Sequence, residues 1–144
     1  MNLTAHFSLA EFTASDTASR LGIDNDAPDE LLPVLTRTAQ GMERIRTMLG
    51  HPVHINSAYR SPKLNAAVGS KPTSQHLRGE AVDFVCPGYG SPAKICRLLQ
   101  PLMVDLAIDQ LILEYGRWVH VSFTDKPRHL ALTIDRAGTT MGIA

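Results

Sequence analysis

A histidine and an aspartate near the middle of the chain, His76 and Asp83, are spaced so that they could hold a metal ion together. They belong to the segment 74–83, SQHLRGEAVD. Gly79 can adopt the backbone of a tight turn, and a strand after this turn would bring the Asp83 carboxylate back toward the His76 imidazole. Catalytic zinc is held by three protein ligands and keeps a fourth position open for water. The pair therefore predicts a zinc site that needs one more ligand.

The same segment resembles the signature of a known family, the zinc D,D-carboxypeptidases and L-alanyl-D-glutamate peptidases. This family includes phage endolysins and shares its zinc fold with the hedgehog signalling domain. Its signature is Ser-x-His-x-x-Gly-x-Ala-x-Asp, and the fixed positions are matched by Ser74, His76, Gly79, Ala81 and Asp83. The alternative is a turn before a buried strand, in which His76 is exposed and backbone donors satisfy Asp83. The complete match favours the metal site.

The resemblance also implies the third ligand and the upstream part of the site. In the family this ligand is a histidine on a late strand after an aromatic residue, which corresponds to His120 in the segment 118–122, WVHVS. A Ser-x-Tyr-Arg-Ser-Pro segment is typical upstream and is found at residues 57–62. The resemblance covers about residues 53–123 and implies one Zn²⁺ per chain, with His76, Asp83 and His120 as its ligands.

The general base is assigned less directly, because the family pattern is broken at one position. Many members carry a glutamate three residues before the last histidine, where this sequence has Arg117. A guanidinium cannot accept a proton at neutral pH. The nearest carboxylate is Glu114, at a spacing similar to the one in the hedgehog branch. The alternative is that Glu114 lies on the solvent face of its strand.

The turn between the last two strands of this region decides between these alternatives. A two-residue turn at positions 116–117 would pair Tyr115 with Trp118. Glu114 would then point away from His120, because side chains alternate between the two faces of a strand. A three-residue loop or a bulge would instead pair Glu114 with Trp118 and give it the face of His120. A catalytic Glu114 therefore predicts an irregular turn.

Five further residues are candidates for the cleft around the metal. Arg60 could stabilise an oxyanion or hold a substrate carboxylate with its planar fork of donors, and the alternative is a surface ion pair. The candidates for substrate binding are Ser74, Gln75, Tyr59 and Trp118. The alternative for Ser74 and Gln75 is that they cap the turn, and for Trp118 that it is a core or rim aromatic.

These residues predict a zinc metallopeptidase that hydrolyses the peptide stem of bacterial peptidoglycan, as a D,D-carboxypeptidase or an endopeptidase. Loops 60–75 and 86–91 are expected to decide which. The first residues contain no basic cluster and no long apolar segment, so we expect synthesis in the cytoplasm without a signal peptide. The enzyme would act on the wall after release in phage lysis, or as part of a virion. The alternative function is a non-catalytic zinc-binding domain of hedgehog-like fold, acting in binding or as a virion component.

The sequence patterns around these residues predict the helices and strands of an α+β protein. A capping box at Ser8 and Glu11 indicates a short first helix, and apolar residues at helical spacing predict a long core helix over 29–49. Further expected elements are strands at 53–57 and 80–85, a short helix or loop from 61, a helix over 92–104, and strands at 110–115, 118–123 and 130–134. We expect a single domain, residues 1–144, with N-terminal helices on a small, mostly antiparallel sheet that carries the zinc site.

Composition excludes several classes of protein. The chain has 144 residues with 14 basic and 14 acidic side chains, so no excess positive charge is present to bind nucleic acid. Apolar runs stay well below the ~18 residues of a membrane span. Cys86 and Cys96 have apolar neighbours and are expected to be buried thiols rather than a disulfide. We expect a monomer with a peptidoglycan peptide as its partner.

Overall fold

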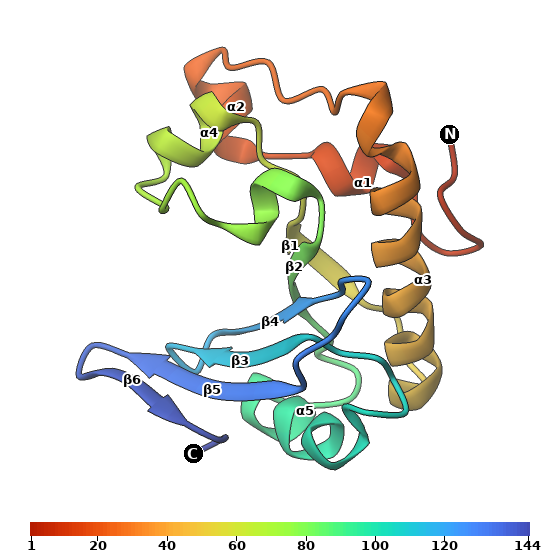
Figure 1. Ribbon diagram of the computed structural model, residues 1–144, viewed down its shortest axis with the longest axis vertical. Helices are drawn as coiled ribbons and strands as arrows, with labels where there is room; N and C mark the ends of the chain where they lie inside the picture. The colour runs from red at the N-terminus through yellow and green to blue at the C-terminus, as the bar shows by residue number, and fades with distance from the viewer.

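The computed structural model describes residues 1–144 and confirms the α+β class (Figure 1). The helices are α1 (Leu9–Thr13), α2 (Asp16–Leu21), α3 (Leu32–Leu49), α4 (Pro62–Ala67) and α5 (Pro92–Leu99), with 3-10 turns η1 (Asp29–Leu31), η2 (Gln75–Arg78) and η3 (Gln100–Leu102). The strands are β1 (His54–Ser57), β2 (Ala81–Val85), β3 (Gln110–Glu114), β4 (Trp118–Ser122), β5 (Leu130–Asp135) and β6 (Gly138–Met141). They form one sheet in the order β1-β2-β4-β3-β5-β6. Only β3 and β5 are parallel neighbours, so the predicted, mostly antiparallel sheet is confirmed.

The long helix α3 forms where the apolar spacing predicts it. Pro33 lies in its first turn, where a missing N–H removes no helical hydrogen bond. Gly50 ends the helix with a φ of +66°, a conformation that glycine adopts without steric cost. The buried face of α3 carries Leu35, Ala39, Met42, Ile45 and Leu49. These side chains join one continuous apolar cluster with residues of β2, β4 and α5. In Figure 1, α3 stands along one side of the sheet and α5 lies beneath β3 and β5.

Three helix starts agree with the sequence prediction and carry a serine cap, but one helix is shorter than predicted. The capping box of Ser8 and Glu11 opens α1, Ser61 caps α4, and Ser91 caps α5. α5 ends at Leu99 instead of reaching residue 104. Pro101 has no N–H to donate to the carbonyl one turn earlier, so the chain continues as the 3-10 turn η3.

Two elements were not predicted, and one boundary is corrected. α2 is a short helix capped by Ser15, whereas the sequence indicated only one short helix before the long one. β6 has four exposed residues and therefore lacks the alternation of apolar and polar residues that identifies a half-buried strand. The first residues of the predicted long helix, from 29 to 31, form the 3-10 turn η1 rather than α-helix.

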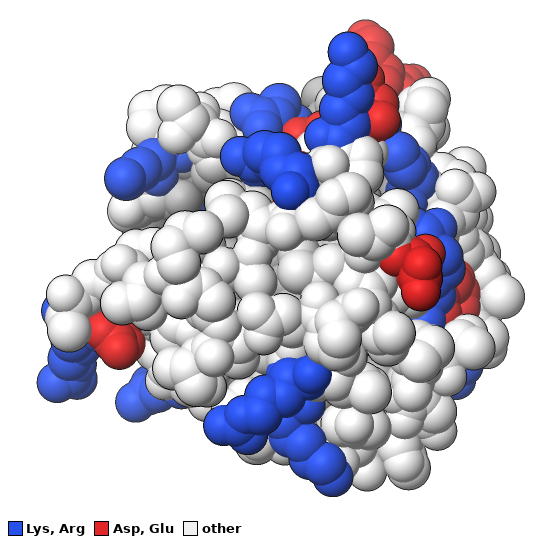
Figure 2. Space-filling model, turned by 60° about the horizontal axis from the view of Figure 1, so that its bottom comes forward, with Lys and Arg blue, Asp and Glu red and all other residues white.

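The cysteines and the surface charge of the structure agree with what the composition predicts. Cys86 and Cys96 are both free and buried, which confirms the prediction of buried thiols. None of the helices is both long enough and apolar enough to cross a membrane. Figure 2 shows that Lys and Arg lie in separate groups around a broad area without charged side chains, so they form no continuous positive surface on this face.

Candidate metal centre

Two of the three predicted metal ligands lie opposite each other on neighbouring strands. Asp83 in β2 pairs with His120 in β4 in the antiparallel ladder, and directly paired residues share one face of a sheet. Asp83 Oδ1 lies 2.8 Å from His120 Nδ1. The sheet itself therefore fixes one carboxylate and one imidazole side by side.

The third predicted ligand, His76, lies on the 3-10 turn η2. The hydroxyl of Ser74 accepts the His76 backbone N–H at the start of η2, and Gly79 ends it with a φ of +73°. His76 Nδ1 lies 2.6 Å from the carbonyl oxygen of Ala58. A carbonyl oxygen only accepts hydrogen bonds, so Nδ1 must carry the ring proton. His76 Nε2 therefore presents its lone pair to the site, where it lies 3.3 Å from Asp83 Oδ2.

The donor set fits a zinc ion. One ligand atom from each of the three residues lies within 4.8 Å of the others, and all three residues are buried. Two ligands about 2.05 Å from one tetrahedral zinc would lie roughly 3.3 Å apart, and His76 Nε2 and Asp83 Oδ2 are separated by 3.3 Å.

The protonation states of His76 and Asp83 also suit a metal, whereas for His120 the effect of burial is more than offset by Asp83 and Glu114, which raise its pKa. Burial lowers the pKa of His76, which keeps its imidazole neutral. Burial by itself opposes ionisation of Asp83, but His76 and His120 more than offset it and hold the Asp83 pKa well below its usual value. A neutral imidazole and an ionised carboxylate are the forms that bind metals.

The turn between β3 and β4 places Glu114 beside the ligands. Glu114 pairs with Trp118, so three residues connect the strands, and Tyr115 and Gly116 have φ values of +55° and +65°. The irregular turn that a catalytic Glu114 requires is therefore confirmed. Glu114 Oε1 lies 3.5 Å from His120 Nδ1, and only 19% of its side chain is exposed. The solvent-face alternative is wrong, and burial raises the pKa of Glu114.

Arg60 also belongs to this group. Its Nη2 lies 3.4 Å from Asp83 Oδ2, and 15% of its side chain is exposed. Its Nε donates to the Ser57 hydroxyl, and its backbone N–H donates to the His76 carbonyl. The alternative of a surface ion pair is therefore wrong, because Arg60 forms a largely buried contact with a predicted metal ligand.

A cleft of about 350 Å³ opens over these groups. Of the predicted substrate-binding residues, Ser74 and Trp118 line it, and Ser74 also caps η2. Sequence reasoning missed Val68, Ser70 and Tyr115, which line it as well. The first two lie in the 60–75 loop but belong to no motif. Loop 86–91 contributes no lining residue, which corrects the expectation that it helps to decide the activity.

Two other predicted substrate-binding residues, Tyr59 and Gln75, do not line the cleft. Tyr59 is 4% exposed and belongs to the apolar core. Gln75 is buried, and its Nε2 donates to Asp109 Oδ2 over 3.0 Å. Asp109 also accepts hydrogen bonds from the Ser122 hydroxyl and from the Arg128 guanidinium. Asp109 thereby ties η2, which carries His76, to the end of β4, and no sequence motif signals this role.

Comparisons with known proteins were made against families and against curated proteins. A family model described as Peptidase M15 matches residues 5–122, which is most of the chain and includes every residue that lines the catalytic cleft. The comparison with curated proteins found no match.

Proposed function

This chain belongs to the peptidase M15 family, and on that premise we propose that it is a zinc metallopeptidase that hydrolyses peptide bonds in the peptide stem of bacterial peptidoglycan. One observation carries the proposal. A His-Asp-His group that could hold a metal ion lies in the same cleft as a half-buried glutamate and an arginine. Metal ligands, a base and a cation for an oxyanion are the parts that metal-assisted peptide hydrolysis needs.

His76, Asp83 and His120 would hold the zinc ion, one per chain. Three protein ligands leave a position open for water or substrate, as in catalytic rather than structural zinc sites. A zinc ion bound there supplies Lewis acidity, which lowers the pKa of water and polarises a peptide carbonyl. The hydrogen bond from His76 to the Ala58 carbonyl holds the ring in the orientation that this role requires.

Glu114 would act as the general base and then as the general acid. Its carboxylate lies next to His120 and faces the cleft, where it can accept a proton from the attacking water and return it to the leaving amine. Burial raises its pKa, which brings the proton affinity of the carboxylate closer to that needed near neutral pH.

Arg60 would stabilise negative charge on the substrate. Its guanidinium lies at the wall of the cleft beside Asp83 and is held in place through Ser57. A fixed, positively charged fork can donate two parallel hydrogen bonds to a developing oxyanion or to a terminal carboxylate. The second of these uses would favour carboxypeptidase over endopeptidase activity.

The substrate and the setting follow from the signature at residues 74–83. Its resemblance to endolysins and D,D-carboxypeptidases supports cell-wall peptide as the substrate and phage-type lysis, or a role within a virion, as the setting. We propose that the protein is made in the cytoplasm, acts on the wall after release, and works as a monomer, because all the proposed catalytic groups come from one chain.

Replacing the base tests the proposal. In Glu114→Gln, zinc measured by mass spectrometry should stay at one per chain, while the release of soluble peptides from purified peptidoglycan should fall by about 10²- to 10⁴-fold. Glu30 is exposed and does not line the cleft. Glu30→Gln is therefore the matched control and should keep both its zinc content and its hydrolytic activity. Retained hydrolysis in Glu114→Gln would remove Glu114 as the base. Zinc binding by the wild type without any hydrolysis would favour a non-catalytic zinc domain instead.

A further inference from the structure

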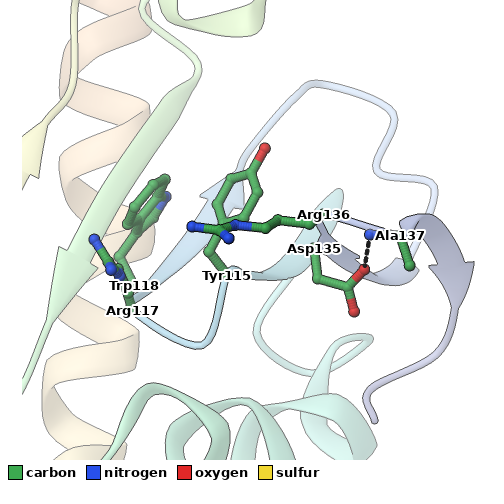
Figure 3. Close-up of a pocket in the computed structure, with 6 residues that line it drawn as sticks. All are labelled: Tyr115, Arg117, Trp118, Asp135, Arg136 and Ala137. Atoms are coloured by element: carbon green, nitrogen blue, oxygen red, sulfur yellow. Dashed lines mark hydrogen bonds between the residues drawn. The ribbon is translucent and has the colours of Figure 1, made fainter.

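A second cavity, of about 550 Å³, adjoins the catalytic cleft. Its walls come from two places, the β3–β4 loop and the start of β4 with Tyr115, Arg117 and Trp118, and the end of β5 and the turn to β6 with Asp135, Arg136 and Ala137 (Figure 3). Tyr115 and Trp118 also line the catalytic cleft. The two hollows are therefore neighbours that share an aromatic wall.

The cavity carries uncompensated positive charge. Arg117 and Arg136 are exposed and form no ion pair in the structure. The single carboxylate in the lining, that of Asp135, already accepts the backbone N–H of Ala137 over 2.8 Å. Figure 3 shows the Arg136 side chain extending from its turn toward Tyr115. Two guanidinium groups thus stand in one hollow with their donors available to an anion.

The aromatic wall is held in an unusual conformation. Tyr115 is 48% exposed and has a φ of +55°, which for a residue other than glycine or asparagine costs about 1–2 kcal/mol. Its backbone N–H donates to Ile134 of β5, and the Arg117 N–H donates to Glu114, so neighbouring strands fix the loop. The Tyr115 and Trp118 rings lie 5.6 Å apart between centroids. Local strain kept at an exposed ring suggests that the ring is needed at this position.

We infer that this cavity is a substrate subsite for an acidic segment of peptide. A carboxylate of the substrate binds Arg117 and Arg136, and the adjoining backbone crosses the faces of Tyr115 and Trp118 into the catalytic cleft. The inference rests on the proposed peptidase function, which supplies a peptide in the cleft. It adds a preference for a negatively charged residue on the side of the scissile bond that faces the β5–β6 turn.

Binding to peptidoglycan tests the subsite without any turnover. The probe is purified, insoluble peptidoglycan in two forms, one native and one with its carboxyl groups converted to amides. Protein carrying Glu114→Gln is sedimented with each form, so that digestion does not disturb the equilibrium. Amidation should weaken binding by about five- to ten-fold, and so should the double substitution Arg117→Gln with Arg136→Gln on native material, since each removes charge-assisted hydrogen bonds.

The control variant is Arg97→Gln, on the exposed side of α5 and outside both cavities. It should bind like its parent, and circular dichroism should show that all variants are folded. The inference is overturned if native and amidated peptidoglycan bind equally, or if the double variant binds like Arg97→Gln. Hydrolysis by the wild-type protein is measured separately, because its absence would refute the peptidase rather than the subsite.

Discussion

The buried carboxylate of Asp109 offers a test of how the fold supports the metal centre. Asp109 is fully buried and accepts hydrogen bonds from Gln75 in η2, from Ser122 in β4 and from Arg128. The substitution Asp109→Asn keeps the shape of the side chain but replaces one acceptor oxygen with a donor. Whichever way the amide turns, at least one of these donors then faces another donor.

The expected loss of stability in Asp109→Asn depends on how deeply each of these hydrogen bonds is buried. The side chain of Arg128 is 55% exposed, so its ion pair is screened by solvent and adds little. The contacts of Gln75 and Ser122 are buried, and a hydrogen bond to a charged acceptor contributes about 1.5 kcal/mol or more. We therefore expect Asp109→Asn to lower the free energy of unfolding by about 2–3 kcal/mol, which corresponds to roughly 5–10 °C in Tm.

The pH dependence of this loss has a definite sign. Burial opposes ionisation of Asp109, but the hydrogen bonds from Arg128, Gln75 and Ser122 hold its pKa well below the usual value. A group whose pKa is depressed in the folded state contributes stability above its unfolded pKa, near 3.9, and loses it as the pH falls toward the folded pKa. The difference in the free energy of unfolding between wild type and Asp109→Asn should therefore be largest at pH 7 and become smaller below about pH 4.

Urea unfolding at pH 7, 5 and 3.5, followed by circular dichroism on the metal-free protein, measures this difference. Asp105 is exposed and makes no side-chain hydrogen bond or ion pair, so Asp105→Asn is the control and should behave like wild type. Zinc affinity should fall in Asp109→Asn only, because η2 carries His76. Unchanged stability, or a loss of stability that is the same at all three pH values, would refute this account of Asp109.

Three shorter predictions concern the core and the turn before β2. In Gly41→Ala the new Cβ would lie 2.5 Å from the Phe123 ring, so urea unfolding should show a loss of about 1–3 kcal/mol; a gain of about 1 kcal/mol, the helix preference of alanine, would contradict this packing. Burial raises the pKa of Cys96 to about 12, and Cys86 is buried as well, so both thiols should resist a thiol reagent until urea unfolds the protein. Rapid labelling of the native protein would show that they are accessible. In Gly79→Ala the φ of +73° and a 3.0 Å approach to a core side chain should lower both stability and zinc affinity, measured by calorimetry; an unchanged affinity would mean that this turn does not position His76.

Two of the proposed metal ligands, His76 and Asp83, could be predicted from the sequence itself because local rules fix their geometry, whereas His120 is implied only by the family resemblance. The spacing from His76 to Asp83 with Gly79 between them defines a turn followed by a strand, and that arrangement hardly depends on the rest of the fold. The face on which Glu114 lies could be predicted only conditionally, because it depends on the length of the turn between β3 and β4. Which turn forms depends on Tyr115 adopting a positive φ, which the propensity of tyrosine does not favour.

The remaining errors arise where tertiary contacts decide. Gln75 and Tyr59 neighbour functional residues in sequence, yet their side chains turn into the interior, toward Asp109 and the apolar core. β6 pairs only with β5 at the edge of the sheet and all four of its residues are exposed, so no alternation of buried and exposed positions is imposed on its sequence. The parallel neighbours β3 and β5 likewise depend on long-range packing that residue patterns do not encode.

The most direct test of the central claim is mass spectrometry of purified peptidoglycan digested with the zinc-loaded protein. The proposed function predicts fragments in which one peptide bond of the stem has been hydrolysed, with a new amine and a new carboxyl end, and predicts that they vanish when a chelator removes the metal. Intact stem peptides, cuts confined to the sugar chains, or the same products from metal-free protein would each contradict it.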